Sequence, residues 1–182
     1  MRKLSMAELN RISSGEYKEA VKMPVIVVLD NIRSLMNIGS IFRTADAFRI
    51  EAIYLCGITA CPPHREIQKT ALGATESVKW EYFASTKEAI AKLKVMQYLI
   101  VSIEQTTESI PLHKARFQAP LALVFGNELE GVSEDAIHLS DEVIEIPQFG
   151  TKHSLNVAVC GGIVIWQCYL KFQSSLTDHQ GD

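Results

Sequence analysis

The run VIVVLD at residues 25–30 sets the architecture expected of this chain. Five consecutive apolar residues followed by a carboxylate are typical of a parallel strand that is buried on both faces. Parallel strands are joined by long crossover connections, usually helices. A helix is accordingly expected next, from Asn37 to Ala47, followed by a second strand at residues 52–56.

The same alternation continues to the end of the chain. Further strands are predicted at residues 78–83, 98–104, 121–126 and 142–147, and further helices at 66–72, 85–94, 133–140 and 154–173. Strands that alternate with helices predict an α/β fold, with a mainly parallel sheet flanked by helices. The strand at 78–83 is mixed in character and is expected near an edge. In such sheets ligands bind in the loops at the carboxyl ends of the strands.

The composition is that of one globular domain. The chain has 182 residues, of which 47% are hydrophobic and 21% are charged. A chain of this length buries roughly 70% of its unfolded surface, so its core needs no disulfide or metal. The formal charge of −3 and the pI near 6.0 exclude a protein that coats nucleic acid by bulk charge. They leave room for a local basic patch.

The ends and the cysteines point to a cytoplasmic protein without a membrane partner. No long apolar run follows the basic start MRKLSMAELN, so no signal peptide is expected, and Ser5 and Glu8 form a capping-box pattern for a short helix. The apolar stretch 155–170 is too short to span a bilayer. The spacing of the four cysteines fits neither a zinc site nor a disulfide framework. They are Cys56, Cys61, Cys160 and Cys168.

Three loops carry more polar residues than folding requires. The first is NIGSIFRTAD at residues 37–46. Asn37 is a good helix N-cap, and Gly39 allows a ligand or another backbone to come close. Arg43 lies four residues after Gly39 and can share a helix face with it. Its guanidinium is either solvated or offers a planar cationic fork to a phosphate or a developing oxyanion.

The second loop is FGNELEGVSED at residues 125–135. Gly126 and Gly131 allow a tight backbone with exposed amide groups, which would suit a small polar ligand. The alternative is a plain strand-to-helix turn with solvated Glu128 and Glu130. The loop is neither a dinucleotide-binding G-x-G-x-x-G nor a phosphate-binding P-loop.

The third loop is IPQFGTKHSLNVAV at residues 146–159. Ser154 is expected to cap the last helix. Asn156 stands at the start of an otherwise apolar helix and has to find hydrogen-bond partners there. Lys152 and His153 add local positive charge.

In this order, the patterns N-x-G-x-x-x-R, G-x-E-x-x-G and I-P-x-x-G-x-x-x-S-L-N-V resemble the three motifs of SpoU/TrmH-type SPOUT RNA 2′-O-ribose methyltransferases. The resemblance covers roughly residues 24–173. It implies an enzyme that depends on S-adenosyl-L-methionine (AdoMet), with a C-terminal trefoil knot, acting as a homodimer. It also implies a short N-terminal helical extension at 1–22, a methyltransferase domain at 23–174 and a flexible tail at 175–182.

The resemblance also assigns roles to individual positions. The expected catalytic set is Asn37, Arg43, Glu128, Ser154 and Asn156. The backbone positions expected to line the AdoMet pocket are Gly126, Ile146 and Leu155. RNA is expected to contact Arg33, Arg43, Arg49, Lys152 and His153, gathered near one cleft with the help of a second subunit. So small a patch predicts few phosphate contacts and a shallow salt dependence.

The substrate and the role of Arg43 stay open at this stage. Arg43 acts either as the general base, as proposed for the family, or by gripping a phosphate and stabilising the developing alkoxide, which suits a group that essentially never loses its proton. Gln148 replaces the Met common after the I-P pair, and Ala158 replaces a frequent Ser. The chain shows neither an extra N-terminal RNA-binding domain nor a long basic C-terminal extension. A transfer RNA, at a D-loop guanosine, is favoured over ribosomal RNA. A non-catalytic AdoMet- or RNA-binding relative is the alternative from another class.

Overall fold

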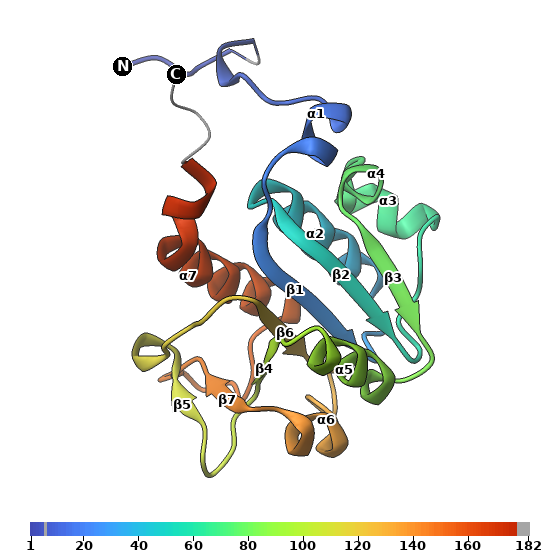
Figure 1. The fold of residues 1–182 in the computed structure, drawn as a ribbon, viewed down its shortest axis with the longest axis vertical. Coiled ribbons are helices and arrows are strands. Elements are labelled where there is room, and N and C mark those ends of the chain that lie inside the picture. Colours follow the sequence, from blue (N-terminus) through green and yellow to red (C-terminus); the bar gives the residue numbers. More distant parts are fainter. Residues whose placement is uncertain (6, 178–182) are drawn as a thin grey trace.

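The computed structural model describes residues 1–5 and 7–177 and is built around one seven-stranded sheet (Figure 1). The strand order is β3-β2-β1-β6-β4-β7-β5, and every neighbouring pair is parallel. The strands are β1 (Met23–Asp30), β2 (Ile50–Cys56), β3 (Trp80–Phe83), β4 (Leu99–Ile103), β5 (Ile110–Pro111), β6 (Leu121–Phe125) and β7 (Glu142–Glu145). The predicted α/β fold is confirmed, and β3 lies at an edge as expected.

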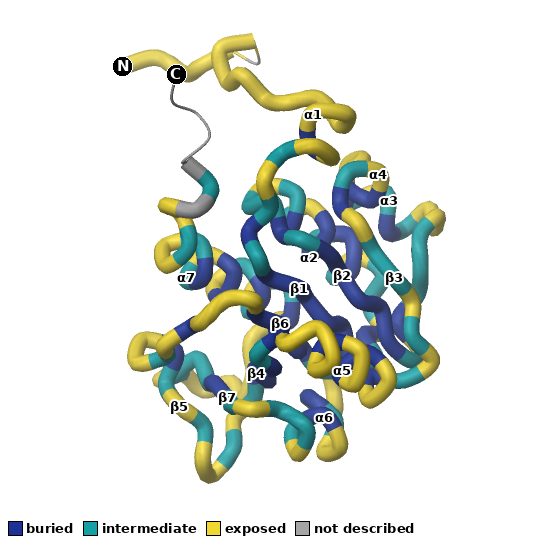
Figure 2. The backbone as a smooth tube through the Cα atoms, viewed as in Figure 1, coloured by how far each residue is buried: buried dark blue, intermediate teal, exposed yellow. Residues whose placement is uncertain are grey.

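Helices cover both faces of the sheet. One face carries α2 (Leu35–Ala47), α3 (Arg65–Ala71), α4 (Ala74–Ser77) and α7 (Val157–Thr177), and the other carries α5 (Thr86–Val95) and α6 (Glu134–Leu139). Figure 2 shows the buried central strands between these layers. The run at 25–30 is continuously apolar because its side chains enter two cores in turn. Val25, Val27 and Leu29 join the core under α2, while Ile26 and Val28 join the core under α5.

The N-terminal extension is mostly exposed (Figure 2) and contains a 3-10 turn, Ala7–Leu9, and the helix α1 (Ser14–Glu19). Tyr17 anchors it, since its ring is buried and its hydroxyl donates to the Ala45 carbonyl at 3.5 Å. At the other end, α7 continues through Thr177, beyond the boundary predicted at residue 174. The remainder of the predicted tail, 178–182, lies outside the described residues.

Two predicted helix starts are wrong. Helix α2 begins at Leu35 because Ser34 is its N-cap and accepts from the Asn37 N–H at 3.3 Å, so Asn37 lies inside the first turn. Helix α7 begins at Val157, not Ser154. Its cap is Asn156, whose Oδ1 accepts from the Ala158 N–H at 2.9 Å.

Ser133 precedes α6, within the helix predicted at 133–140, and makes no side-chain capping bond. Sequence reasoning also missed three short elements, β5, α4 and the 3-10 turn Leu112–Lys114. No helix in residues 1–5 and 7–177 combines the length and the apolar character that a membrane span requires.

Strand β7 lies between two strands that precede it and are consecutive in the chain. It pairs with β4 on one side and with β5 on the other. The chain reaches β7 from α6 on one face of the sheet and leaves it towards α7 on the opposite face (Figure 1). The chain therefore crosses the sheet in the space between β4 and β5. The trefoil knot that the resemblance implies stays a prediction.

Candidate active site

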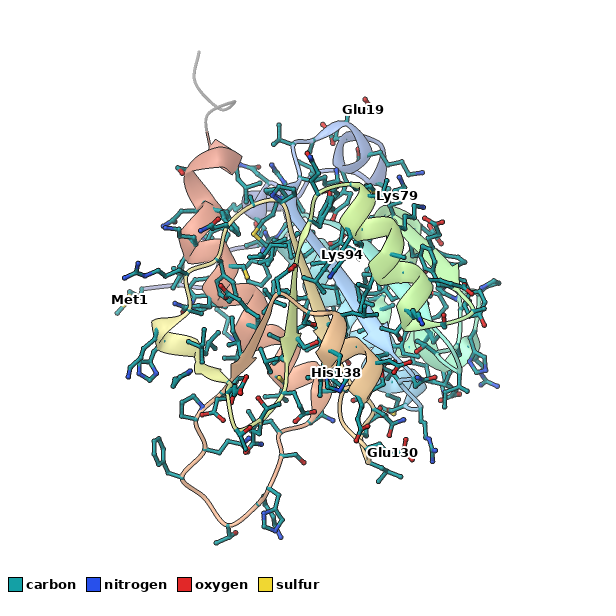
Figure 3. All side chains as sticks on the ribbon, turned by 60° about the horizontal axis from the view of Figure 1, so that its bottom comes forward. Met1, Glu19, Lys79, Lys94, Glu130 and His138 are labelled. Atoms are coloured by element: carbon teal, nitrogen blue, oxygen red, sulfur yellow. The ribbon has the colours of Figure 1, made fainter. Side chains whose placement is uncertain are left out.

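A cavity of about 690 Å³ opens at the carboxyl ends of β4, β6 and β7. This volume lies in the range of small-molecule and cofactor sites. Its lining residues are 103–106, 125–132, 134, 137, 145, 146, 148, 153–157 and 160. Figure 3 shows the loop between β7 and α7 projecting from the end of the molecule at which Glu130 lies. The three residues predicted to line the AdoMet pocket, Gly126, Ile146 and Leu155, all lie in the cavity wall.

The turn after β6 is closed on itself. Asn127 and Gly131 exchange two backbone hydrogen bonds of 2.9 Å, and Asn127 Oδ1 accepts from the N–H groups of Leu129 and Glu130. The prediction that this loop exposes its amide groups is wrong for these residues. So short a turn between two glycines brings the Asn127 side chain within reach of the backbone donors.

Close packing explains the glycine at the start of this turn. A Cβ atom on Gly126 would lie well inside van der Waals contact with the backbone of Gly131 and Val132. The structure therefore requires glycine here for a close approach of two backbones.

The glycine in α2 has the same kind of explanation. A Cβ on Gly39 would collide with Ile67 and Thr70 of α3. Of the two possibilities that the sequence left open, a ligand or another backbone, the structure places a backbone at Gly39.

Three residues of the predicted catalytic set form one hydrogen-bonded chain. Glu128 Oε1 accepts from Asn37 Nδ2 at 3.0 Å, and Asn37 Oδ1 accepts from Asn156 Nδ2 at 3.0 Å. The Glu128 carboxylate also accepts from the backbone N–H groups of Arg33 and Ser34, each at 3.0 Å. These hydrogen bonds thus link the turn after β6 to the first turn of α2 and to the cap of α7. The predicted partners of Asn156 are found.

The hydrogen bonds on Glu128 predict a pH dependence. Burial raises the pKa of this carboxyl, but the donors on Arg33, Asn37 and Ser34 outweigh it and hold the pKa below its usual range. A depressed pKa in the folded state contributes stability at neutral pH that is lost as the pH falls below about 4.5. We expect Glu128→Gln to reduce the loss of unfolding free energy that the parent protein shows as the pH falls. Urea unfolding between pH 3 and 7 measures this. The same decrease of unfolding free energy with falling pH in variant and parent would contradict it.

Arg43 lies away from the hydrogen-bonded side chains of Glu128, Asn37 and Asn156. It is exposed, six residues beyond Asn37, which is about 9 Å along the helix axis. It lines a second cavity of about 610 Å³ together with Arg11 and Arg49. Within one chain His153 lines the first cavity and Arg43 the second, so the predicted gathering of these residues near one cleft would need the second subunit. Arg11 is a candidate that sequence reasoning missed.

The remaining predicted residues lie near the first cavity. Ser154 is exposed in its wall, and Lys152 is exposed in the same loop. Arg33 is exposed just before α2.

The first cavity is rich in carboxylates. Among the residues that the structure describes, no lysine or arginine lines this cavity. Its carboxylates are those of Glu104, Glu128, Glu130, Glu134 and Glu145. Such a lining favours a ligand that carries positive charge. Cys160 also lines the cavity, and burial, with a smaller effect of Glu104, raises the pKa of its thiol to about 11. In the part of the chain that the structure describes, no three His, Cys, Asp or Glu residues gather as a metal ion would need.

Comparison with known proteins gives the same family from sequence and from structure. Residues 24–166 match the model of the SpoU rRNA Methylase family. The chain is 32% identical to a tRNA (guanosine(18)-2′-O)-methyltransferase of Aquifex aeolicus over 158 residues, 84% of this chain and 72% of that protein. It is 30% identical to a 23S rRNA (guanosine-2′-O-)-methyltransferase of Neisseria meningitidis, covering 78% of this chain but 56% of that relative.

Solved structures agree. The crystal structure of an A. aeolicus TrmH/SpoU tRNA modifying enzyme superposes with a TM-score of 0.78 and 26% identity, over 89% of this chain and 81% of that one. An AdoMet-bound rRNA methyltransferase from Sinorhizobium meliloti gives a TM-score of 0.76 and 25% identity, over 84% and 61%. The order of the three loop motifs, the sheet and these matches together show that the chain belongs to the SpoU rRNA methylase family.

Proposed function

We propose that this protein transfers a methyl group from AdoMet to a ribose 2′-hydroxyl of structured RNA. A transfer RNA is the favoured substrate, with a D-loop guanosine as the expected position. The observation that carries the proposal is the Glu128–Asn37–Asn156 chain beside the cavity, because it joins all three family motifs at one place. Similarity to a tRNA guanosine methyltransferase over 84% of this chain supports tRNA. Ribosomal RNA is the alternative, on similarity to the Neisseria enzyme.

The residues of the first cavity fit AdoMet. When bound, AdoMet supplies an electrophilic methyl group on a sulfonium cation, and the carboxylate-rich lining suits a cation. Gly126, Ile146 and Leu155 would hold it through their backbone. The transfer is assigned to a domain of residues 23–174, and a cytoplasmic location belongs to the same proposal.

In the proposed mechanism the side chains of this protein position the RNA and stabilise charge. The Glu128 carboxylate fixes Asn37, and Asn37 fixes Asn156, so the three are preorganised at the cavity. Ser154, in the cavity wall, helps to orient the ribose. The Arg43 guanidinium grips a substrate phosphate and stabilises the negative charge that develops on the 2′-oxygen.

A second copy of the chain is part of the proposal. Arg43 and the cofactor cavity belong to different parts of one chain, so a partner that brings the two together would complete the site. Helix α7 offers a surface for such a partner, because its exposed apolar residues recur at helical spacing on one face. These residues are Val159, Ile163, Trp166 and Leu170.

We expect Trp166→Glu to convert a dimer into a monomer, because it places a charge at the centre of this apolar stripe. Sedimentation analysis of the purified protein measures the change. Val95→Glu is the matched control, since Val95 is an apolar residue, 85% exposed, on α5 at the opposite face of the sheet. A parent protein that sediments as a monomer at all concentrations would contradict the proposed dimer.

The arginines of the second cavity are proposed to contact RNA phosphates, together with Arg33, Lys152 and His153. Replacing one phosphate contact lowers the slope of log affinity against log salt by about 0.7–0.9. We therefore expect Arg11→Ala and Arg49→Ala each to weaken RNA binding and to flatten this slope by about that amount. Fluorescence anisotropy with labelled tRNA between 50 and 300 mM KCl measures it. Arg65→Ala, at an exposed arginine outside both cavities, should leave the slope unchanged.

The activity is tested by incubating the purified protein with AdoMet and either unmodified tRNA or ribosomal RNA. The RNA is then digested and its 2′-O-methylated nucleosides are measured by mass spectrometry. We expect 2′-O-methylguanosine in tRNA. Methylation of ribosomal RNA alone would favour the alternative substrate. Binding of AdoMet without methylation of any RNA would identify a non-catalytic relative.

A further inference from the structure

Glu104 belongs to none of the three family motifs, yet it lies where the walls of the first cavity meet. It directly follows β4 and lines the cavity. Its Oε2 accepts from the Val132 N–H at 2.9 Å, and its Oε1 accepts from the Gln105 N–H at 2.8 Å. Both carboxylate oxygens are therefore committed to backbone donors, one of them in the turn after β6.

The turn after β6 is packed between Glu104 and Gly126. Gly131 has a φ of +73°, and a Cβ there would collide with the Glu104 carboxylate. On the other side, a Cβ on Gly126 would collide with the backbone of the same turn. The Glu104 carboxylate and the backbone at Gly126 thus both pack against the turn that forms this wall of the cavity.

Gln105 holds the opposite wall. Its Nε2 donates to the His153 carbonyl at 2.9 Å. Within residues 147–154, all of which the structure describes, this is the one hydrogen bond recorded. Residues 149–156 are otherwise exposed. Residues 147–154 are therefore held to the cavity by one side-chain hydrogen bond, while Asn156 after them is held by Asn37.

We propose that Glu104 and Gln105 are positioning residues that set the distance between the two walls of the cofactor cavity. Glu104 places the turn after β6, and Gln105 places the segment before α7. The proposal rests on the AdoMet site proposed above. It predicts that removing either contact weakens cofactor binding although neither residue belongs to a family motif.

Calorimetric titration of AdoMet into the RNA-free protein tests the proposal with Glu104→Gln and Gln105→Leu. Both substitutions keep the size of the side chain. Gln105→Leu removes the contact to the His153 carbonyl, and Glu104→Gln leaves one acceptor oxygen for the two backbone N–H groups of Gln105 and Val132. Loss of a hydrogen bond of this kind is expected to raise the Kd for AdoMet about tenfold. In steady-state assays the KM for AdoMet should rise while kcat and the KM for RNA change little.

Gln68→Leu is the matched control for Gln105→Leu. Gln68 also donates from Nε2 to another residue, Thr75 Oγ1 at 2.8 Å, but it lies outside the cavity. It should leave the affinity for AdoMet unchanged. Limited proteolysis adds a second readout, since Gln105→Leu should speed tryptic cleavage after the exposed Lys152 without lowering the Tm.

The outcomes separate this proposal from the one it rests on. A parent protein that does not bind AdoMet would contradict both the proposed function and the positioning role. A parent that binds AdoMet, together with a Gln105→Leu variant of equal affinity and unchanged tryptic cleavage, would overturn the positioning role alone. If Glu104→Gln fails to fold, Gln105→Leu still decides, because the exposed loop that it holds lies outside both cores.

Discussion

Replacing Arg43 by alanine is expected to abolish methyl transfer while leaving AdoMet binding intact. Removing one preorganised donor that stabilises transition-state charge costs about 10²–10³ in kcat. Arg43 is exposed and lines a different cavity from the one assigned to the cofactor, so its loss should not disturb that cavity. Single-turnover methylation of tRNA and calorimetry with AdoMet measure the two effects separately.

Arg43→Lys distinguishes charge from geometry. Lysine keeps the positive charge but cannot offer the planar fork of a guanidinium. We expect it to restore RNA affinity more fully than turnover. Near-normal turnover of Arg43→Ala would remove Arg43 from the mechanism.

Substituting Gly126 by alanine is expected to abolish measurable AdoMet binding. The added methyl group would meet the backbone of Gly131 and Val132, which cannot rotate away as a side chain can. Overpacking of this kind costs about 1–3 kcal/mol, and it displaces the turn that forms one wall of the cavity. The Tm is expected to fall by several degrees for a chain of this size.

Gly150→Ala is the control within the same site. Gly150 lies in the segment before α7, and a Cβ there would have nothing within 4 Å. We expect this variant to bind AdoMet as the parent does. Equal affinity of Gly126→Ala and Gly150→Ala would show that the turn after β6 does not limit the cavity.

The sheet could be predicted because its signals are local. Residues 25–29 are apolar on both sides of the strand and are buried on both sides in the structure. The strand β5 escaped prediction because it has two residues, one of them a proline. The starts of α2 and α7 were misplaced because Asn37, Ser34, Ser154 and Asn156 are all acceptable caps. Only the surrounding loop decides among them.

Most residues of the site could be predicted from the sequence, but the contacts between them could not. The motif order identified Glu128, Asn37 and Asn156, but their bonds join residues 91 and 119 positions apart, which spacing does not predict. The closed turn was missed because its amides are satisfied by the side chain of Asn127. Glu104 was missed because a carboxylate after a strand has no pattern of its own. Arg43 follows Gly39 by four residues on α2, but it lines the second cavity and not the first.

The insertion of β7 between β4 and β5 orders the events of folding. Strand β7 follows both of its neighbours in the chain, and contacts between distant segments form slowly. The segment that completes the cofactor cavity follows β7 in the chain. A refolding chain should therefore regain its helices and the pairing of β1, β2 and β6 well before it regains a place for AdoMet. In the cell, a ribosome must release the last third of this chain before the enzyme can acquire its methyl donor.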